Sequence, residues 1–194
     1  MKSLPSMKKI FFIGLFGILT CAAVGLATYS QERDIAGYPV PPANDNSLFY
    51  IQRSKNINAI VYDANVNADG TLNTESPVRI YWIRYAEDST SAPLTYIQQK
   101  FAYGLKATPY PGKPGQYILV FNSYAKKQIY LLKKQDGKHF AAYMMISGHY
   151  SELKRVFIRI SGGTFWIPTI DYIDIIGIDM ATQKQVTDHF KPAQ

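Results

Sequence analysis

The stretch YILVFNSYAKKQIYLLKKQDGKHFAAYMMI, residues 117–146, carries the pattern that decides the fold. It holds three short runs rich in tyrosine, isoleucine, valine and phenylalanine, which are residue types that favour β-strands. Asp136-Gly137, a dipeptide typical of tight hairpins, separates the last two runs. The runs cover residues 117–122, 128–134 and 139–146. They predict consecutive antiparallel strands.

Similar strand-like runs lie on both sides of this stretch. Further runs are expected at residues 48–53, 58–64, 78–86, 153–160, 170–180 and 185–190. Short strands with turns every 8–12 residues are typical of antiparallel sandwiches and barrels. We therefore expect a mainly β domain over residues 47–194, a single antiparallel β-sandwich or barrel of about eight or nine strands. The pattern leaves sandwich and barrel open.

One segment has a helical period instead. Leu94, Ile97, Phe101 and Leu105 recur at helical spacing. Pro93 suits a first turn and Gly104 a helix stop, so one short helix is predicted near 93–103. Its apolar stripe indicates core packing. The following segment, 108–115, has three prolines and two glycines and predicts an irregular loop.

The N-terminus has the three parts of a secretory signal. Residues 1–9 hold three lysines and no acid, residues 10–27 are uncharged and largely apolar, and small residues follow up to Ser30. We expect residues 1–30 to be a signal peptide that directs export to the periplasm or cell envelope. Residues 31–46, with three prolines, are expected to be a linker.

Three fates compete for the signal segment. Cleavage after Ala27 or after Ser30 is favoured, because the run lies at the very N-terminus. The 18 residues of 10–27 also reach the lower limit for an uncleaved spanning anchor. Lipidation of Cys21 is the third, although Thr20 is a poor residue before a modified cysteine. Cys21 is the only cysteine, so cleavage would leave a domain without disulfides or thiol chemistry.

Charge and motifs exclude several classes of function. Removing residues 1–30 lowers the formal net charge from +7 to +4, and the remaining basic residues are scattered, which argues against nucleic-acid binding. No zinc-protease, phosphate-loop, nucleophile-elbow or dinucleotide motif is present, and no cofactor or metal is expected. Asp171, Asp174 and Asp179 would not all share one strand face, so they are interpreted as edge charges.

Aromatic residues offer a route to ligand binding. Strand alternation places Val78, Ile80 and Trp82 on one face, and Trp82 is expected in the core. If the domain has a pocket for an apolar or sugar-like ligand, the expected lining is Tyr81, Trp82, Tyr85 and Tyr103, with Arg53 and Arg84 as polar contacts. Tyr110, Tyr143 and Trp166 are further candidates. The alternative is an ordinary sheet core filled by these rings.

A catalytic alternative centres on His149. The segment Ser147-Gly148-His149-Tyr150-Ser151-Glu152 brings hydroxyls and a carboxylate near an imidazole. A hydrolase would need His149 within hydrogen-bond reach of a serine or carboxylate in an open cleft. The same composition is common in turns for solubility alone.

Three motifs carry a family resemblance. Ile51-Gln52-Arg53-Ser54 through Tyr62-Asp63, then Tyr81-Trp82-Ile83, then Ala102-Tyr103-Gly104, resemble an uncharacterised family of exported bacterial domains, a domain of unknown function numbered forty-eight thirty-three. The resemblance covers residues 48–107. It implies a secreted or envelope protein of a Gram-negative bacterium, and it transfers no catalytic residue.

Together these patterns predict an exported, non-enzymatic binding or interaction module. Its expected partner is a small ligand or an envelope protein, and it would meet a membrane only through an uncleaved or lipidated N-terminus. A structural envelope component with a filled core and a hydrolase centred on His149 are the alternatives.

Overall fold

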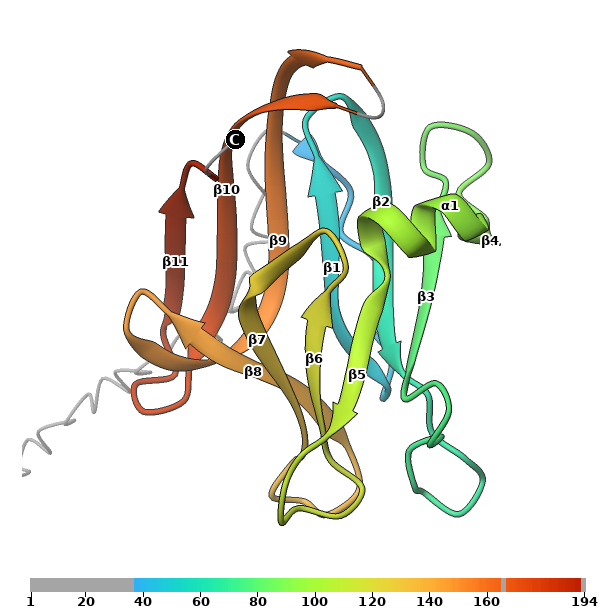
Figure 1. Cartoon of the computed structure of the whole chain (residues 1–194), viewed down its shortest axis with the longest axis vertical. Coiled ribbons are helices and arrows are strands. Elements are labelled where there is room, and N and C mark those ends of the chain that lie inside the picture. Colours follow the sequence, from blue (N-terminus) through green and yellow to red (C-terminus); the bar gives the residue numbers. More distant parts are fainter. Residues whose placement is uncertain (1–36, 165–166, 193–194) are drawn as a thin grey trace, which may run out of the picture. The chain divides into compact units, whose positions relative to one another are not determined.

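A computed structural model describes residues 37–164 and 167–192, all within one compact unit of residues 33–194 (Figure 1). The predicted signal peptide, residues 1–30, lies outside the described residues, as do 31–36 of the predicted linker and Trp166. The described part of the unit is mainly β, as predicted, with antiparallel pairing throughout except between β1 and β9. The strands are β1 (Ser47–Arg53), β2 (Asn56–Ala64), β3 (Val78–Ile83), β4 (Ser91–Pro93), β5 (Leu105–Pro109), β6 (Tyr117–Phe121), β7 (Tyr124–Lys133), β8 (Phe140–Ile146), β9 (His149–Gly163), β10 (Pro168–Asp179) and β11 (Gln185–Phe190).

The sheet branches at β9. One edge of this long strand pairs with β10 from Ser151 to Gly163. Its other edge pairs first with β8, through residues 149–152, and then with β1, through residues 155–158. Strands β2, β3 and β4 continue outward from β1, while β7, β6 and β5 continue from β8. Two arms of sheet therefore diverge from one strand.

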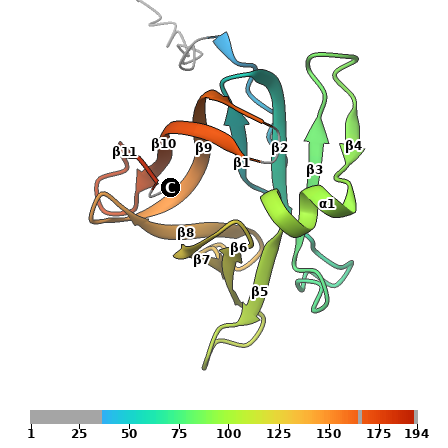
Figure 2. The same cartoon turned by 45° about the horizontal axis from the view of Figure 1, so that its top comes forward.

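The prediction of a closed sandwich or barrel is wrong. The described residues form one open sheet of eleven strands, which curls around a shared apolar core (Figure 2). A branch at β9 cannot be read from sequence, because it depends on pairing between residues more than 100 positions apart. The strand count exceeds the expected eight or nine because β4 is only three residues long and β5 runs into the proline-rich segment for which the sequence predicts an irregular loop.

The predicted helix is present but shorter and of a different kind. Helix α1 (Tyr96–Gln98) begins at Thr95 with a capping box, in which the Thr95 side chain and the Gln98 side chain each bind the other's backbone N–H. It continues as a π-helix, Gln99–Tyr103, which ends before Gly104. Pro93 belongs to β4 instead of the first turn. Among the described residues, no helix combines the length and the apolar character needed to cross a bilayer.

Two bulges turn apolar side chains to the concave side of the curled sheet. In the β9–β10 ladder, Ile176 pairs with Arg155 and Gly177 with Leu153, so Lys154 is left out of the register. Because a bulge shifts the alternation by one, the side chains before and after it can reach the same face. A second bulge consists of two neighbouring irregularities, which leave out Ser161 of β9 and Asp171 of β10 and together restore the register.

Residues 37–46 run along the sheet without forming a strand. The Gln52 side-chain amide donates to the carbonyl oxygen of Pro39, 2.6 Å away, and the Tyr38 hydroxyl donates to the carbonyl of Ser54, also at 2.6 Å. The Tyr38 ring packs edge-on against Phe157. This part of the predicted linker is therefore attached to the domain.

Candidate functional site

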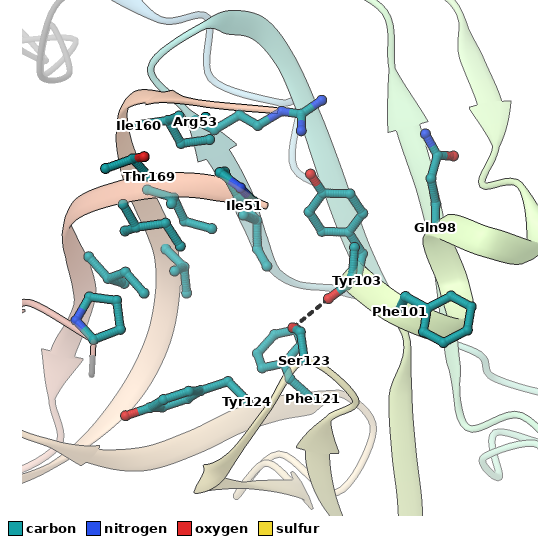
Figure 3. A pocket seen from close by; sticks show the side chains of 18 of the residues that line it. Ile51, Arg53, Gln98, Phe101, Tyr103, Phe121, Ser123, Tyr124, Ile160 and Thr169 are labelled. Carbon is teal, nitrogen blue, oxygen red and sulfur yellow. Dashed lines mark hydrogen bonds between the residues drawn. The ribbon is translucent and has the colours of Figure 1, made fainter. Parts of the chain in front are cut away.

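A cavity of about 850 Å³ lies on the concave side of the sheet (Figure 3). Its wall is mainly apolar, with side chains from β1, β6, β9 and β10. These include Ile51, Phe121, Leu153, Val156, Ile158 and Ile173. Phe101 and Ile167 also line the cavity, and they are 62% and 78% exposed, so they mark the side on which it opens to solvent.

The bulges of β9 and β10 build this wall. Leu153 and Val156 both line the cavity, although they are three residues apart, because the bulge at Lys154 lies between them. Ile170 and Ile173 do the same across Asp171. The Ser161 hydroxyl donates to the Asp171 carboxylate at 2.5 Å and so ties the two strands together at the second bulge.

The end of the β1–β2 hairpin places a cation at the cavity. Ile51 and Arg53 alternate with Gln52 and therefore both face inward. Beyond them, the Ser54 hydroxyl donates to the carbonyl of Ile160 at 2.9 Å and accepts from the N–H of Ile160 at 2.8 Å. The Ser54 N–H donates to the carbonyl of Ile158. These three bonds extend the parallel β1–β9 pairing past the strand and fix the turn that carries Arg53.

Two aromatic rings hold the Arg53 guanidinium. Its Cζ lies 5.5 Å from the centre of the Trp82 ring and 5.9 Å from that of Tyr103. Both distances suit cation–π attraction. Burial raises the pKa of the Tyr103 hydroxyl, and the neighbouring Arg53 charge opposes that rise. Within residues 37–164 and 167–192, no acceptor reaches the buried Arg53 Nε and no carboxylate forms an ion pair with Arg53.

The π-helix forms another part of the wall and is held by side chains from distant strands. The Ser123 hydroxyl donates to the carbonyl of Ala102 at 2.6 Å, and the Asn122 amide donates to that of Gln99 at 3.1 Å. These carbonyls lie at a helix end, where the backbone has no partner of its own. Gly104 is required just beyond, because a Cβ there would overlap the Gln99 carbonyl oxygen. π-Helical turns occur frequently at functional sites.

Three of the six predicted ligand-binding residues come together here. Arg53 and Tyr103 line the cavity. Trp82 lies behind them in the core, with its ring edge-on to Tyr103 at 5.5 Å and its Nε1 donating to the Gln98 side chain at 3.2 Å.

The other three lie away from the cavity lining. The Tyr81 hydroxyl donates to the buried Asp63 carboxylate at 3.0 Å, and Arg79 joins the same carboxylate. The Tyr85 hydroxyl donates to the carbonyl of Val40.

The Arg84 guanidinium is paired through its terminal nitrogens within its own loop, while its buried Nε has no acceptor among the described residues. Its guanidinium pairs with Glu87 at 3.1 Å and Asp88 at 2.9 Å, and it donates to the Thr90 hydroxyl. Unlike Arg53, Arg84 therefore has two local carboxylates to balance its charge.

His149 meets a carboxylate in a turn region and not in the cavity. Its Nδ1 lies 3.4 Å from Asp179 Oδ2, and its side chain is 53% exposed. Asp179 in turn accepts from the Thr182 hydroxyl and the Ala181 N–H, so it organises the β10–β11 turn. The Ser151 hydroxyl donates to the His149 backbone carbonyl, away from the imidazole. These contacts are typical of a turn, and they do not place a nucleophile beside a general base.

Asp174 and Asp171 are also engaged structurally. Asp174 Oδ1 lies 2.6 Å from His189 Nδ1 across the β10–β11 pair. Within the described ranges, no group of three or more histidine, cysteine or acidic side chains is gathered as a metal site would require.

Sequence reasoning missed most of the apolar wall. Phe121, Ile158 and Ile173 lie in predicted strands, but nothing in the sequence indicates which face of each strand is concave. The bulges at Lys154 and Asp171 interrupt the alternation that would have grouped these side chains.

Comparison with known proteins matches the chain to a family. Residues 49–189 match a family described as "Domain of unknown function (DUF4833)". The matched segment starts in β1 and ends in β11, so it includes Arg53, Tyr103 and the two bulges. No curated protein and no solved structure matches the chain.

Proposed function

This chain belongs to the DUF4833 family, and from that premise we propose that it is an exported, non-enzymatic protein that binds an apolar ligand in the cavity of its curled sheet. The observation that carries the proposal is the cavity itself, about 850 Å³ in volume and walled by isoleucine, leucine, valine and phenylalanine. Ligand sites commonly fall in the range of about 300–1,000 Å³ and have mostly apolar linings.

The cavity argues against a purely structural component. Protein interiors normally pack to the density of organic crystals, and voids larger than a water molecule are few. A sheet with a purely structural role would be more stable if it closed over these apolar side chains and removed them from water. A cavity that is open to solvent on one side is better suited to binding a ligand.

Binding can be tested with the neutral fluorescent probe N-phenyl-1-naphthylamine. We expect saturable enhancement of its fluorescence, with one probe bound per chain. Ile173→Trp places an indole in the cavity and should weaken binding about tenfold or more, which corresponds to 1.4 kcal/mol. Ile57→Trp is the matched control, because Ile57 is exposed on β2 outside the cavity lining. No saturable binding, or equal loss in both variants, would contradict a ligand cavity.

Export is the second part of the proposal and rests on residues 1–30. We expect the protein in the periplasm or envelope fraction, with an N-terminus at Thr28 or Gln31. Determining the N-terminal sequence of the purified protein, together with cell fractionation, checks this. A chain that retains Met1 and sediments with membranes would support the anchor instead. A chain that retains Met1 in the cytoplasm would contradict export.

A further inference from the structure

We propose that the ligand of this cavity is an acyl chain with an anionic head group, and that the head group pairs with Arg53 while the chain lies against β9 and β10. This inference rests on the proposed function, since it names the chemical class of the apolar ligand.

The charges around the cavity are of one sign. Arg53, Lys55 and Lys127 line it, and no aspartate or glutamate does so in the described part of the chain. Lys127 is already neutralised, because its Nζ lies 2.6 Å from Asp188. Lys55 is exposed to solvent on the hairpin turn. Arg53 is therefore the cation that faces the cavity without a counter-charge.

The position of Arg53 suits a bidentate anion. Cation–π contacts with Trp82 and Tyr103 hold the guanidinium at the two rings, and the Tyr103 hydroxyl also interacts with Arg53, but none of these groups carries a negative charge. A guanidinium has five donors in a fixed fork that matches a carboxylate or phosphate. The buried Nε has no acceptor among the described residues, and leaving such a group unpaired is unfavourable. An anionic head group would satisfy it, and the Tyr103 hydroxyl lies beside the same position (Figure 3).

The rest of the wall suits an alkyl chain and not a sugar. Away from Arg53, the lining contributed by β9 and β10 is dominated by Leu153, Val156, Ile158, Ile173 and Ile175. A sugar would need several hydrogen-bonding partners on this wall to replace its bound water. Burial of an alkyl chain against aliphatic side chains is instead favourable, because it removes apolar surface from water.

A ligand series with one chain length separates the head group from the tail. Tetradecanoate, tetradecanol and tetradecyltrimethylammonium, each below its critical micelle concentration, compete with bound N-phenyl-1-naphthylamine on the purified full chain. We expect tetradecanoate to bind about tenfold or more tightly than tetradecanol, and the cation to bind weakest. Equal affinities, or preference for the alcohol or the cation, would overturn the anionic head group.

Substitution of Arg53 assigns the preference to one residue. Arg53→Met keeps the length and the apolar stem, so tetradecanoate affinity should fall to that of tetradecanol while tetradecanol binding is retained. Arg53→Lys keeps the charge but loses the fork, and an intermediate loss is expected. Lys106→Met removes one positive charge from β5, outside the cavity lining, and should leave the preference intact. An unchanged preference in Arg53→Met would overturn the assignment even if the variant folds less stably, because all ligands are compared on the same protein.

The anion could come from a free fatty acid or from a phospholipid. Tetradecanoyl-lysophosphatidylglycerol, which carries the same chain on a phosphodiester, is the second arm of the competition. Whichever of the two anions binds more tightly identifies the source of the head group. If neither exceeds tetradecanol while N-phenyl-1-naphthylamine still binds, the anionic head group fails and the apolar cavity stands. If N-phenyl-1-naphthylamine does not bind at all, the proposed function fails first.

Discussion

The Tyr62 hydroxyl donates a hydrogen bond to the backbone carbonyl of Tyr103, with an oxygen–oxygen distance of 2.8 Å. The bond joins the middle of β2 to the last residue of the π-helix, 41 positions later in the chain. Tyr62 is fully buried and its ring stacks on Phe49 at 4.3 Å. Burial raises the pKa of Tyr62 well above its ordinary value, so this hydroxyl remains a donor. The fold thereby fixes the backbone from which Tyr103 reaches Arg53.

Tyr62→Phe should lower the free energy of unfolding by about 1–3 kcal/mol, because it leaves the buried Tyr103 carbonyl without its donor. Denaturant unfolding of the full chain measures the loss. Tyr96→Phe is the control, since Tyr96 is 72% exposed and its change should stay within about 0.5 kcal/mol. Equal effects of the two substitutions would mean that the carbonyl finds another partner.

Trp82→Ala should cost about 3–5 kcal/mol, because it opens a void in the core and removes the ring on which Arg53 rests. Such a loss is a large part of the ~5–15 kcal/mol that stabilises a typical domain. Trp82→Phe retains an aromatic face and should cost less. A loss of less than about 1 kcal/mol for Trp82→Ala in denaturant unfolding would place this side chain outside the packed core.

Gly104→Ala should destabilise the domain by about 1–3 kcal/mol, as forced overpacking does. The added Cβ would overlap the Gln99 carbonyl oxygen and come within 2.8 Å of the Asn122 side chain, so the π-helix must shift. Gly162→Ala is the matched control, because a Cβ there meets only Thr169 at ordinary contact distances of 3.7–3.9 Å. Thermal unfolding gives the melting temperatures of both variants. Equal changes in melting temperature would show that the end of the π-helix shifts without a loss of stability.

Asp136 should titrate below the ordinary range of an aspartate. Hydrogen bonds from the His139 backbone and side chain, and from the Lys138 backbone, lower its pKa. A carboxylate with a depressed folded pKa adds stability above its unfolded value of about 4, and this contribution is lost as the pH falls towards the lower folded value. Asp136→Asn should therefore be less stable than the parent chain at pH 7, with a difference that narrows below about pH 4. An NMR titration of the Asp136 carboxyl with an ordinary midpoint would contradict this.

Most of the strands are predictable from sequence, and the cavity wall is not. Alternation in residues 48–53 places Ile51 and Arg53 together, and the strands of the structure follow the predicted runs closely in β1, β6, β8 and β11. Alternation fails in β9 and β10 because each contains a bulge, and a bulge leaves no clear mark on composition. The parallel pairing of β1 with β9 also depends on tertiary packing, which a local pattern does not contain.

Arg53 and Arg84 show how far the sequence can separate an arginine that has a counter-charge from one that lacks it among the described residues. Both lie in apolar runs for which the sequence predicts strands, so both are expected to need a partner. For Arg84 the partners are close in the sequence, at Glu87 and Asp88 three and four positions later. For Arg53 no acid follows within nine residues, since the next is Asp63, which binds Arg79 and Tyr81 instead. The presence or absence of nearby carboxylates therefore separates the two arginines on sequence alone.

The branch at β9 has a consequence for how the domain folds. β1 and the β8 arm have no common edge until residues 149–158 are in place, so the hydrogen bonds between Ser54 and Ile160 close a loop of 106 residues. Long loop closure is entropically costly, and sheets built on distant pairings fold in roughly milliseconds to seconds instead of microseconds. A chain emerging from the ribosome can form the β6–β7–β8 hairpins early, but it has no cavity until β9 arrives. The ordering of β9 is thus the step that joins the two arms and completes the native sheet.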